Sequence, residues 1–181
     1  MFVEAVLDGT FTGKKLRREI SELSDRVKKC DITVALSDYF DLCVLIKNLE
    51  TALSLSERPL EQFLSPDIKK GLGSLKSKQE KLYSEIADAI MFGHDTYPKL
   101  FEALQKQAVC DEEREPLNTI KEQFTNIWGV IQVCMEELRT KTRVNVLESI
   151  QITGEKFVEV FDIDVLRRKK DATADVVSEE F

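Results

Sequence analysis

The chain has 181 residues, of which 43% are hydrophobic and 33% are charged, and its formal net charge is −7. This length is close to that of one domain with a real core, and the composition is typical of a folded, soluble, helix-rich protein. The acidic balance argues against a nucleic-acid surface, which needs a basic footprint, and disfavours broad docking on anionic lipid. With only 7 Gly and 4 Pro, we expect long uninterrupted elements.

Helical periodicity dominates the N-terminal part of the chain. Residues 12–29 carry one apolar stripe at alternating steps of four and three, which predicts an amphipathic helix. The segment 31–38 interrupts the stripe, and Ser37 is a candidate N-cap for a second helix that continues to about Leu53. One continuous bent helix through 31–36 is the alternative.

Two further helices are predicted by their start signals. Ser65 and Pro66 place a cap and a first-turn proline ahead of a helix that Gly93 is expected to end in the left-handed conformation. Asp95 or Thr96 then caps a short amphipathic helix.

The C-terminal half begins with the clearest amphipathic pattern. Acidic residues at 111–113 precede a long apolar stripe, as expected at a helix start. Residues 144–166 are ambiguous, and we favour a helix at 156–167 over strands. Because FVEAVLDG at 2–9 is echoed by FVEVFDID at 157–164 and contains a hairpin-type Asp-Gly, a small β-pairing of the two ends is an alternative.

These elements predict an all-α fold. Consecutive helices joined by short loops pack antiparallel, so we expect an antiparallel bundle of four long helices with one or two short accessory helices and coiled-coil-like packing. We divide the chain into an N-terminal segment (1–11), a helical bundle domain (12–167) and a charged C-terminal tail (168–181).

The sequence offers little catalytic chemistry. Its single histidine, His94, lies in a predicted loop without a neighbouring nucleophile, and the four cysteines are too widely spaced for a paired zinc motif. We therefore predict no enzyme, no catalytic or metal-binding residues and no cofactor. Cysteines without a signal peptide favour a reduced, cytoplasmic protein.

Aromatic residues and the C-terminus are the candidate partner-binding features. A bundle of this size has more aromatic side chains than one layer needs, which leaves Phe124, Trp128, Phe157 and Phe161 as candidates for a groove or a dimer face. The last three residues, Glu179, Glu180 and Phe181, resemble the acidic-aromatic C-termini that CAP-Gly domains bind, as at the end of α-tubulin. A free carboxylate after an apolar side chain also suits PDZ domains, although a frayed end is the simpler interpretation.

We therefore expect a non-enzymatic interaction module, such as an adaptor, scaffold or regulatory subunit. Its partner would be another protein, with a second copy of the chain as an alternative, and not nucleic acid. A membrane-active bundle is the competing hypothesis, which the net charge disfavours. A helical carrier of a small apolar ligand is a weaker one.

Overall fold

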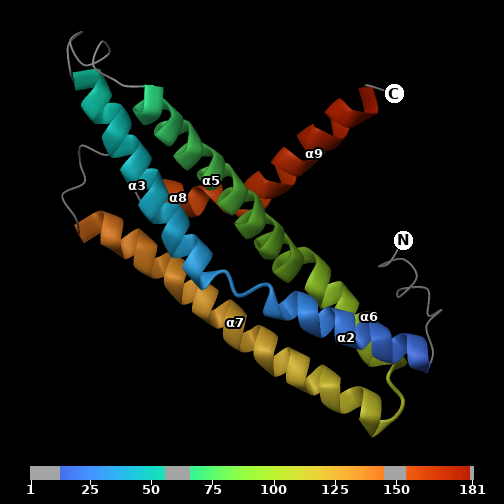
Figure 1. Cartoon of the computed structure of the whole chain (residues 1–181). Coiled ribbons are helices and arrows are strands. Elements are labelled where there is room, and N and C mark those ends of the chain that lie inside the picture. Colours follow the sequence, from blue (N-terminus) through green and yellow to red (C-terminus); the bar gives the residue numbers. More distant parts are fainter. Residues whose placement is uncertain (1–12, 56–65, 145–153, 180–181) are drawn as a thin grey trace. The chain divides into compact units, whose positions relative to one another are not determined.

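The computed structural model describes residues 13–55, 66–144 and 154–179, and within these ranges every regular element is a helix (Figure 1). The elements are α2 (Lys14–Lys28), α3 (Thr33–Leu55), α5 (Pro66–Met91), the π-helix η1 (Phe92–Thr96), α6 (Tyr97–Gln107), α7 (Asp111–Val144), α8 (Gly154–Val160) and α9 (Ile163–Glu179). The all-α prediction is thus confirmed.

Contacts between residues divide the chain into two compact units, whereas we predicted a single bundle domain at residues 12–167. Unit 1 comprises Met1–Ile32 and Asp88–Gln132, and unit 2 comprises Thr33–Ala87 and Val133–Phe181. Each unit is described by itself.

The core of unit 1 is built on the apolar stripe of α2. The stripe residues Leu16, Ile20, Leu23 and Val27 are all buried, and they pack with apolar side chains of α6 and of the first half of α7. The central members are Leu16, Leu23, Val27, Leu100, Leu104, Leu117 and Ile120. Burial of such side chains stabilises each helix far more than its intrinsic propensity does.

The break between α2 and α3 lies earlier than the sequence suggested. The N–H groups of Cys30 and Asp31 donate to the carbonyls of Val27 and Lys28, at 3.0 Å and 3.3 Å, which tightens and ends α2. Helix α3 then begins at Thr33, so the prediction that Ser37 caps it is wrong. A continuous bent helix is excluded as well, because residues 31 and 32 are not helical.

Gly93 does not end a helix, contrary to our prediction. It lies in η1, which links α5 directly to α6, and its φ angle is not positive. The N–H of Tyr97 donates to the carbonyl of Phe92, five residues earlier, as in a π-helix. Pro98 explains the wide turn, since its ring would clash with the carbonyl four residues before it in a regular α-helix.

The indole of Trp128 explains why a glycine is found in η1. A Cβ on Gly93 would lie 2.8 Å from Cε3 of Trp128, far inside normal contact distance. Thr96 makes no side-chain cap bond, so the predicted second start at Asp95 or Thr96 is replaced by a continuing helical chain.

In unit 2, α3 and the first part of α5 run antiparallel. Lys76 Nζ lies 2.6 Å from Glu50 Oε1, and Gln79 Nε2 donates to Cys43 Sγ at 3.1 Å. A residue later in α5 thus lies beside a residue earlier in α3. The predicted start of α5 at Pro66 is confirmed.

An aromatic cluster joins α3, α5 and α8 in unit 2. Its rings belong to Tyr39, Phe40, Tyr83, Phe157 and Phe161, with centroids 5.3–6.1 Å apart. Phe157 is almost completely buried. This cluster anchors α8, which is too short to be stable alone.

The described C-terminal part of the ambiguous segment, residues 154–166, forms helix on both sides of a two-residue break. Residues 157–160 belong to α8, 163–164 belong to α9 and 161–162 connect the two helices, which leaves no strand there for the proposed β-pairing, while residues 2–9 are outside the described ranges. The single helix expected at 156–167 is divided because Asp162 caps a new one: its Oδ1 accepts from the N–H of Asp164 at 2.9 Å. Helix α9 then continues to Glu179, through most of the segment that we assigned to a charged tail.

Candidate functional site

His94, the single histidine, is not arranged for catalysis. Its Nδ1 lies 3.0 Å from Oδ1 of the neighbouring Asp95, at an exposed position on η1. Among the described residues, no group of three His, Cys, Asp or Glu side chains could hold a metal ion. We therefore sought a candidate site among surfaces rather than among reactive groups.

Phe124 and Trp128 lie together in unit 1. Their rings stack with centroids 5.5 Å apart, and Phe124 also stacks on Tyr97 at 3.6 Å. Both side chains are half-buried. The structure thus brings these two predicted residues into one cluster whose main contacts are internal.

Phe157 and Phe161 are both buried, with 2% and 3% of their surface exposed. They fill the interior of unit 2 rather than presenting a surface. The side chain of Glu179 and residues 180–181 lie outside the described residues, so the prediction of a C-terminal ligand stays a prediction.

The outward side of α3 is the strongest candidate surface. Six exposed residues fall at helical spacing along one side of this helix: Val34, Asp38, Asp41, Leu45, Leu49 and Ala52. We call this side the outer face of α3. Val34, Leu45 and Leu49 are 74%, 45% and 37% exposed. Apolar residues therefore lie on the solvent side of α3 as well as on its core side, which an ordinary amphipathic surface helix avoids.

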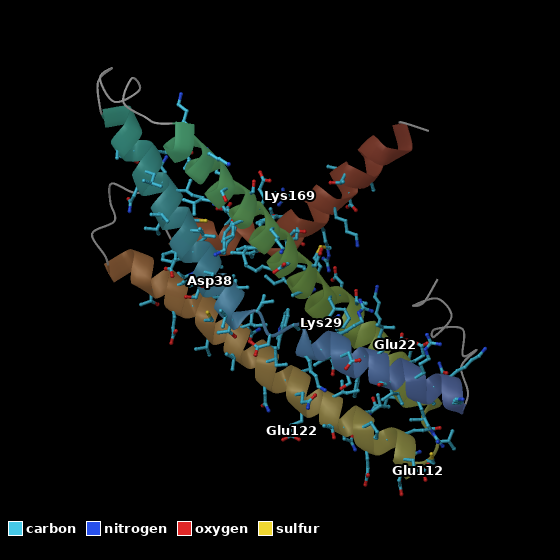
Figure 2. The ribbon with its side chains drawn as sticks, in the orientation of Figure 1. Glu22, Lys29, Asp38, Glu112, Glu122 and Lys169 are labelled. Atoms are coloured by element: carbon cyan, nitrogen blue, oxygen red, sulfur yellow. The ribbon has the colours of Figure 1, made fainter. Side chains whose placement is uncertain are left out.

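The two carboxylates give the outer face of α3 a polarity along its length. Asp38 and Asp41 lie in its N-terminal half, and Leu45, Leu49 and Ala52 follow (Figure 2 labels Asp38). Among the described residues, no cation lies within ion-pair distance of either carboxylate. The face thus has an acidic stretch, preceded by the single apolar residue Val34, and an apolar second half.

Sequence reasoning missed most of this surface. The apolar stripe at Tyr39, Leu42, Ile46 and Leu49 predicts the core side of α3, but Leu49 is exposed, and the exposed Leu45 lies outside that stripe. A usable signal was present, because apolar residues in this segment occupy more than one side of the helix.

A second candidate is a groove of about 410 Å³ in unit 1, between α2 and α7. Its lining comprises Arg17, Ile20, Ser21, Ser24, Glu112, Pro116, Thr119 and Ile120. Arg17 and Glu112 form an exposed ion pair at 3.3 Å. Since Pro116 has no N–H, the carbonyl of Glu112 lacks its usual intrahelical donor and remains available as an acceptor.

The start of α7 is well capped beside this groove. Glu113 Oε2 accepts from the N–H of Val109 at 3.0 Å, and this bond lowers the pKa of Glu113. The carbonyl of Cys110 accepts from the N–H groups of Glu113 and Arg114, both at 3.1 Å. These bonds fix the helix end structurally.

The cysteines differ in their surroundings. None of the four forms a disulfide; Cys30 and Cys43 are buried, whereas Cys110 is exposed. Burial raises the pKa of Cys30 to about 11, with Arg26 opposing the shift. Burial also raises the pKa of Cys43, although hydrogen bonds with Gln79 and Tyr39 act against it.

Glu19 is the notable buried acid. It is 7% exposed, and its Oε2 has no hydrogen-bond partner among the described residues. Burial and the repulsion of Glu22 raise its pKa, while Arg18 lowers it. The desolvated carboxylate therefore opposes folding when it is ionised.

Comparison with known proteins adds no functional assignment: no family model, curated protein or solved structure matches the chain. In the described ranges, no helix has the length and apolar character needed to cross a membrane.

Proposed function

We propose that the protein is a non-enzymatic interaction module, an adaptor or regulatory subunit, that binds a partner protein through the outer face of α3. The observation that carries this proposal is the exposed row formed by Leu45, Leu49 and Ala52 on a helix whose other side is already buried. An amphipathic helix that lies along such a row makes its contacts through residues spaced three and four apart.

Covering the apolar residues of the outer face of α3 with a partner would lower the free energy relative to leaving them in water. Full burial of a leucine side chain is worth roughly 1.5–3 kcal/mol, so covering the exposed parts of Leu45 and Leu49 contributes on the order of 1 kcal/mol each. Two such anchors with a polar rim suit a transient complex rather than an obligate one.

The membrane-active alternative has less support. Asp38 and Asp41 stand on the same face as the leucines and would be repelled by anionic lipid. The basic residues at 167–170 are exposed on α9, but Lys169 Nζ donates to Tyr83 Oη at 3.0 Å and Arg167 pairs with Asp164 at 3.5 Å (Figure 2 labels Lys169).

The groove between α2 and α7 favours a second candidate function, the carriage of a small ligand. Its volume of about 410 Å³ falls within the range of small-molecule sites. Ile20 and Ile120 form an apolar floor beneath hydroxyl groups and the Arg17–Glu112 pair, which suits an amphipathic molecule.

The finer architecture and the location belong to the same proposal. We propose that the long helices pack as an antiparallel four-helix bundle, supported by the antiparallel pairing of α3 with α5 through Glu50–Lys76 and Cys43–Gln79. We also propose a cytoplasmic location, supported by four cysteines that form no disulfide, which suits a reducing compartment.

The test is quantitative crosslinking capture of partners from cytosol with the full chain. The double variant Leu45→Glu/Leu49→Glu should reduce capture of any specific partner about tenfold, because two buried charges replace two apolar anchors. The matched control is Ser74→Glu/Ser77→Glu, which adds the same charges at exposed positions of α5.

Equal capture by the leucine double variant and the wild-type protein would contradict the proposal. Anionic liposomes provide the second arm. Salt-sensitive liposome binding that needs residues 166–170 would favour the membrane-active alternative instead.

A further inference from the structure

We infer that the outer face of α3 binds one chemical class of partner, an amphipathic helix with apolar residues along one side and a cluster of Lys or Arg at one end. This inference rests on the proposed function and adds the partner's charge and the direction in which it lies. The basic end of the partner would lie against Asp38 and Asp41, and its apolar part against Leu45, Leu49 and Ala52.

Charge complementarity is the first support. Asp38 and Asp41 are one turn apart on the same side of α3, both exposed, and among the described residues neither has a cation within ion-pair distance. Glu50 shows the contrast on the same helix, because it pairs with Lys76 at 2.6 Å. The acidic end of the outer face therefore lacks the neutralising partner that a basic helix would supply.

The segregation of the two kinds of residue is the second support. The carboxylates lie in the first half of the face, after Val34, and Leu45, Leu49 and Ala52 occupy the second half without interruption by charge. A uniformly apolar helix would leave the acids unpaired, and a uniformly basic one would set cations on the leucines. Only a partner with the same division satisfies both halves, and this fixes its direction along α3.

A second copy of α3 fits this face poorly. A parallel pair would place the carboxylates of both copies side by side, which is repulsive. An antiparallel pair would either set Asp38 and Asp41 against the apolar half or leave them without a cation. The inferred partner is therefore a separate helix of opposite charge.

Designed peptides test the inference without knowledge of the natural partner. The basic probe is a labelled helical peptide of about 20 residues with leucines at spacings of four and three, followed by three lysines. The acidic probe has glutamates in place of the lysines and is otherwise identical. Binding of each probe to the full-length protein is measured by fluorescence anisotropy at low and physiological salt.

We expect the wild-type protein to bind the basic probe about tenfold more tightly than the acidic probe, with the difference shrinking as salt rises. Asp38→Lys/Asp41→Lys should reverse the preference, and the milder Asp38→Asn/Asp41→Asn should abolish it. Leu45→Glu/Leu49→Glu should remove binding of both probes. Circular dichroism and thermal unfolding verify that each variant is folded, and Ser74→Glu/Ser77→Glu is the control.

Other outcomes overturn the inference in distinguishable ways. Equal binding of both probes that still requires Leu45 and Leu49 would refute the charge assignment and leave the proposed function standing. A preference that persists in both aspartate double variants would place the recognition elsewhere, as would probe binding that survives the leucine substitutions. Failure of wild-type protein to bind either probe refutes the helix class, whereas self-association that requires Leu45 would identify a second copy as the partner.

Discussion

Units 1 and 2 each contain an aromatic cluster, but the rings meet in different ways. In unit 1, Tyr97, Phe124 and Trp128 lie in nearly parallel stacks, with interplanar angles of 16° and 17°, and the indole covers the bare backbone at Gly93. In unit 2, the rings around Phe157 meet at angles up to 89°.

The difference has a physical meaning. Parallel rings need a flat surface, and in unit 1 a glycine supplies part of it, so this cluster should tolerate an added atom poorly. Tilted rings interlock and fill a volume, so the cluster of unit 2 should suffer most when a ring is removed. Addition and deletion of atoms therefore probe the two units separately.

The largest effect should come from Phe157→Ala in unit 2. Loss of a fully buried ring costs about 3–5 kcal/mol, since the tilted neighbours cannot collapse into the cavity. The melting temperature should fall by about 10 °C. Hydrogen exchange should report lost protection in α3 and α8 before α2, and a loss spread evenly over both units would contradict the contrast.

A smaller effect is expected from Gly93→Ala in unit 1. The added methyl group would lie 2.8 Å from Cε3 of Trp128, so the indole must move, at a cost of about 1–3 kcal/mol in unfolding free energy. Chemical denaturation measures this change.

Two companion variants sharpen the test. Gly129→Ala, at a helical site with no atoms within 4 Å of its added Cβ, should instead gain about 0.5–1 kcal/mol. The cost of Gly93→Ala should shrink in a Trp128→Leu background. An unchanged cost there would show that the backbone of η1, not the indole, excludes the methyl group.

The smallest effect concerns the buried carboxyl of unit 1. The pKa of Glu19 is raised in the folded state, so its contribution to stability is fully present below the unfolded value of 4.5 and is lost as pH rises through the folded pKa. Glu19→Gln should therefore raise the melting temperature near pH 7.5 and leave it unchanged near pH 4.

Glu122→Gln is the control, because Glu122 is an exposed acid on α7 in the same unit and is not among the charges that shift the pKa of Glu19. This variant should show no such gain at pH 7.5. The same gain in both variants would mean that net charge, and not burial of Glu19, sets the pH dependence.

Much of the helical framework was predictable because its signals are local. The stripe of α2, the proline at the start of α5 and the acids at the start of α7 each depend on residues within one or two turns. The aspartate that opens α9 was also a local signal, but the apolar run before Asp162 masked it.

The features of the fold and of the candidate site that we did not predict depend on contacts between residues distant in sequence. Gly93 looked like a helix terminator because the ring of Trp128, 35 positions later, is invisible in the local pattern. Phe157 and Phe161 looked available to a partner because their burial depends on α3 and α5. The exposure of Leu45 likewise depends on which side of α3 its neighbours cover.

The two buried thiols are natural probes of local unfolding in this protein. Cys30 lies in unit 1 and Cys43 in unit 2, and the raised pKa of each keeps it protonated and unreactive while its unit is closed. Alkylation of either thiol must wait for its own unit to open. Mass spectrometry of the two labelled peptides would therefore time the opening of each unit in a single unmodified chain, with the exposed Cys110 as the internal standard.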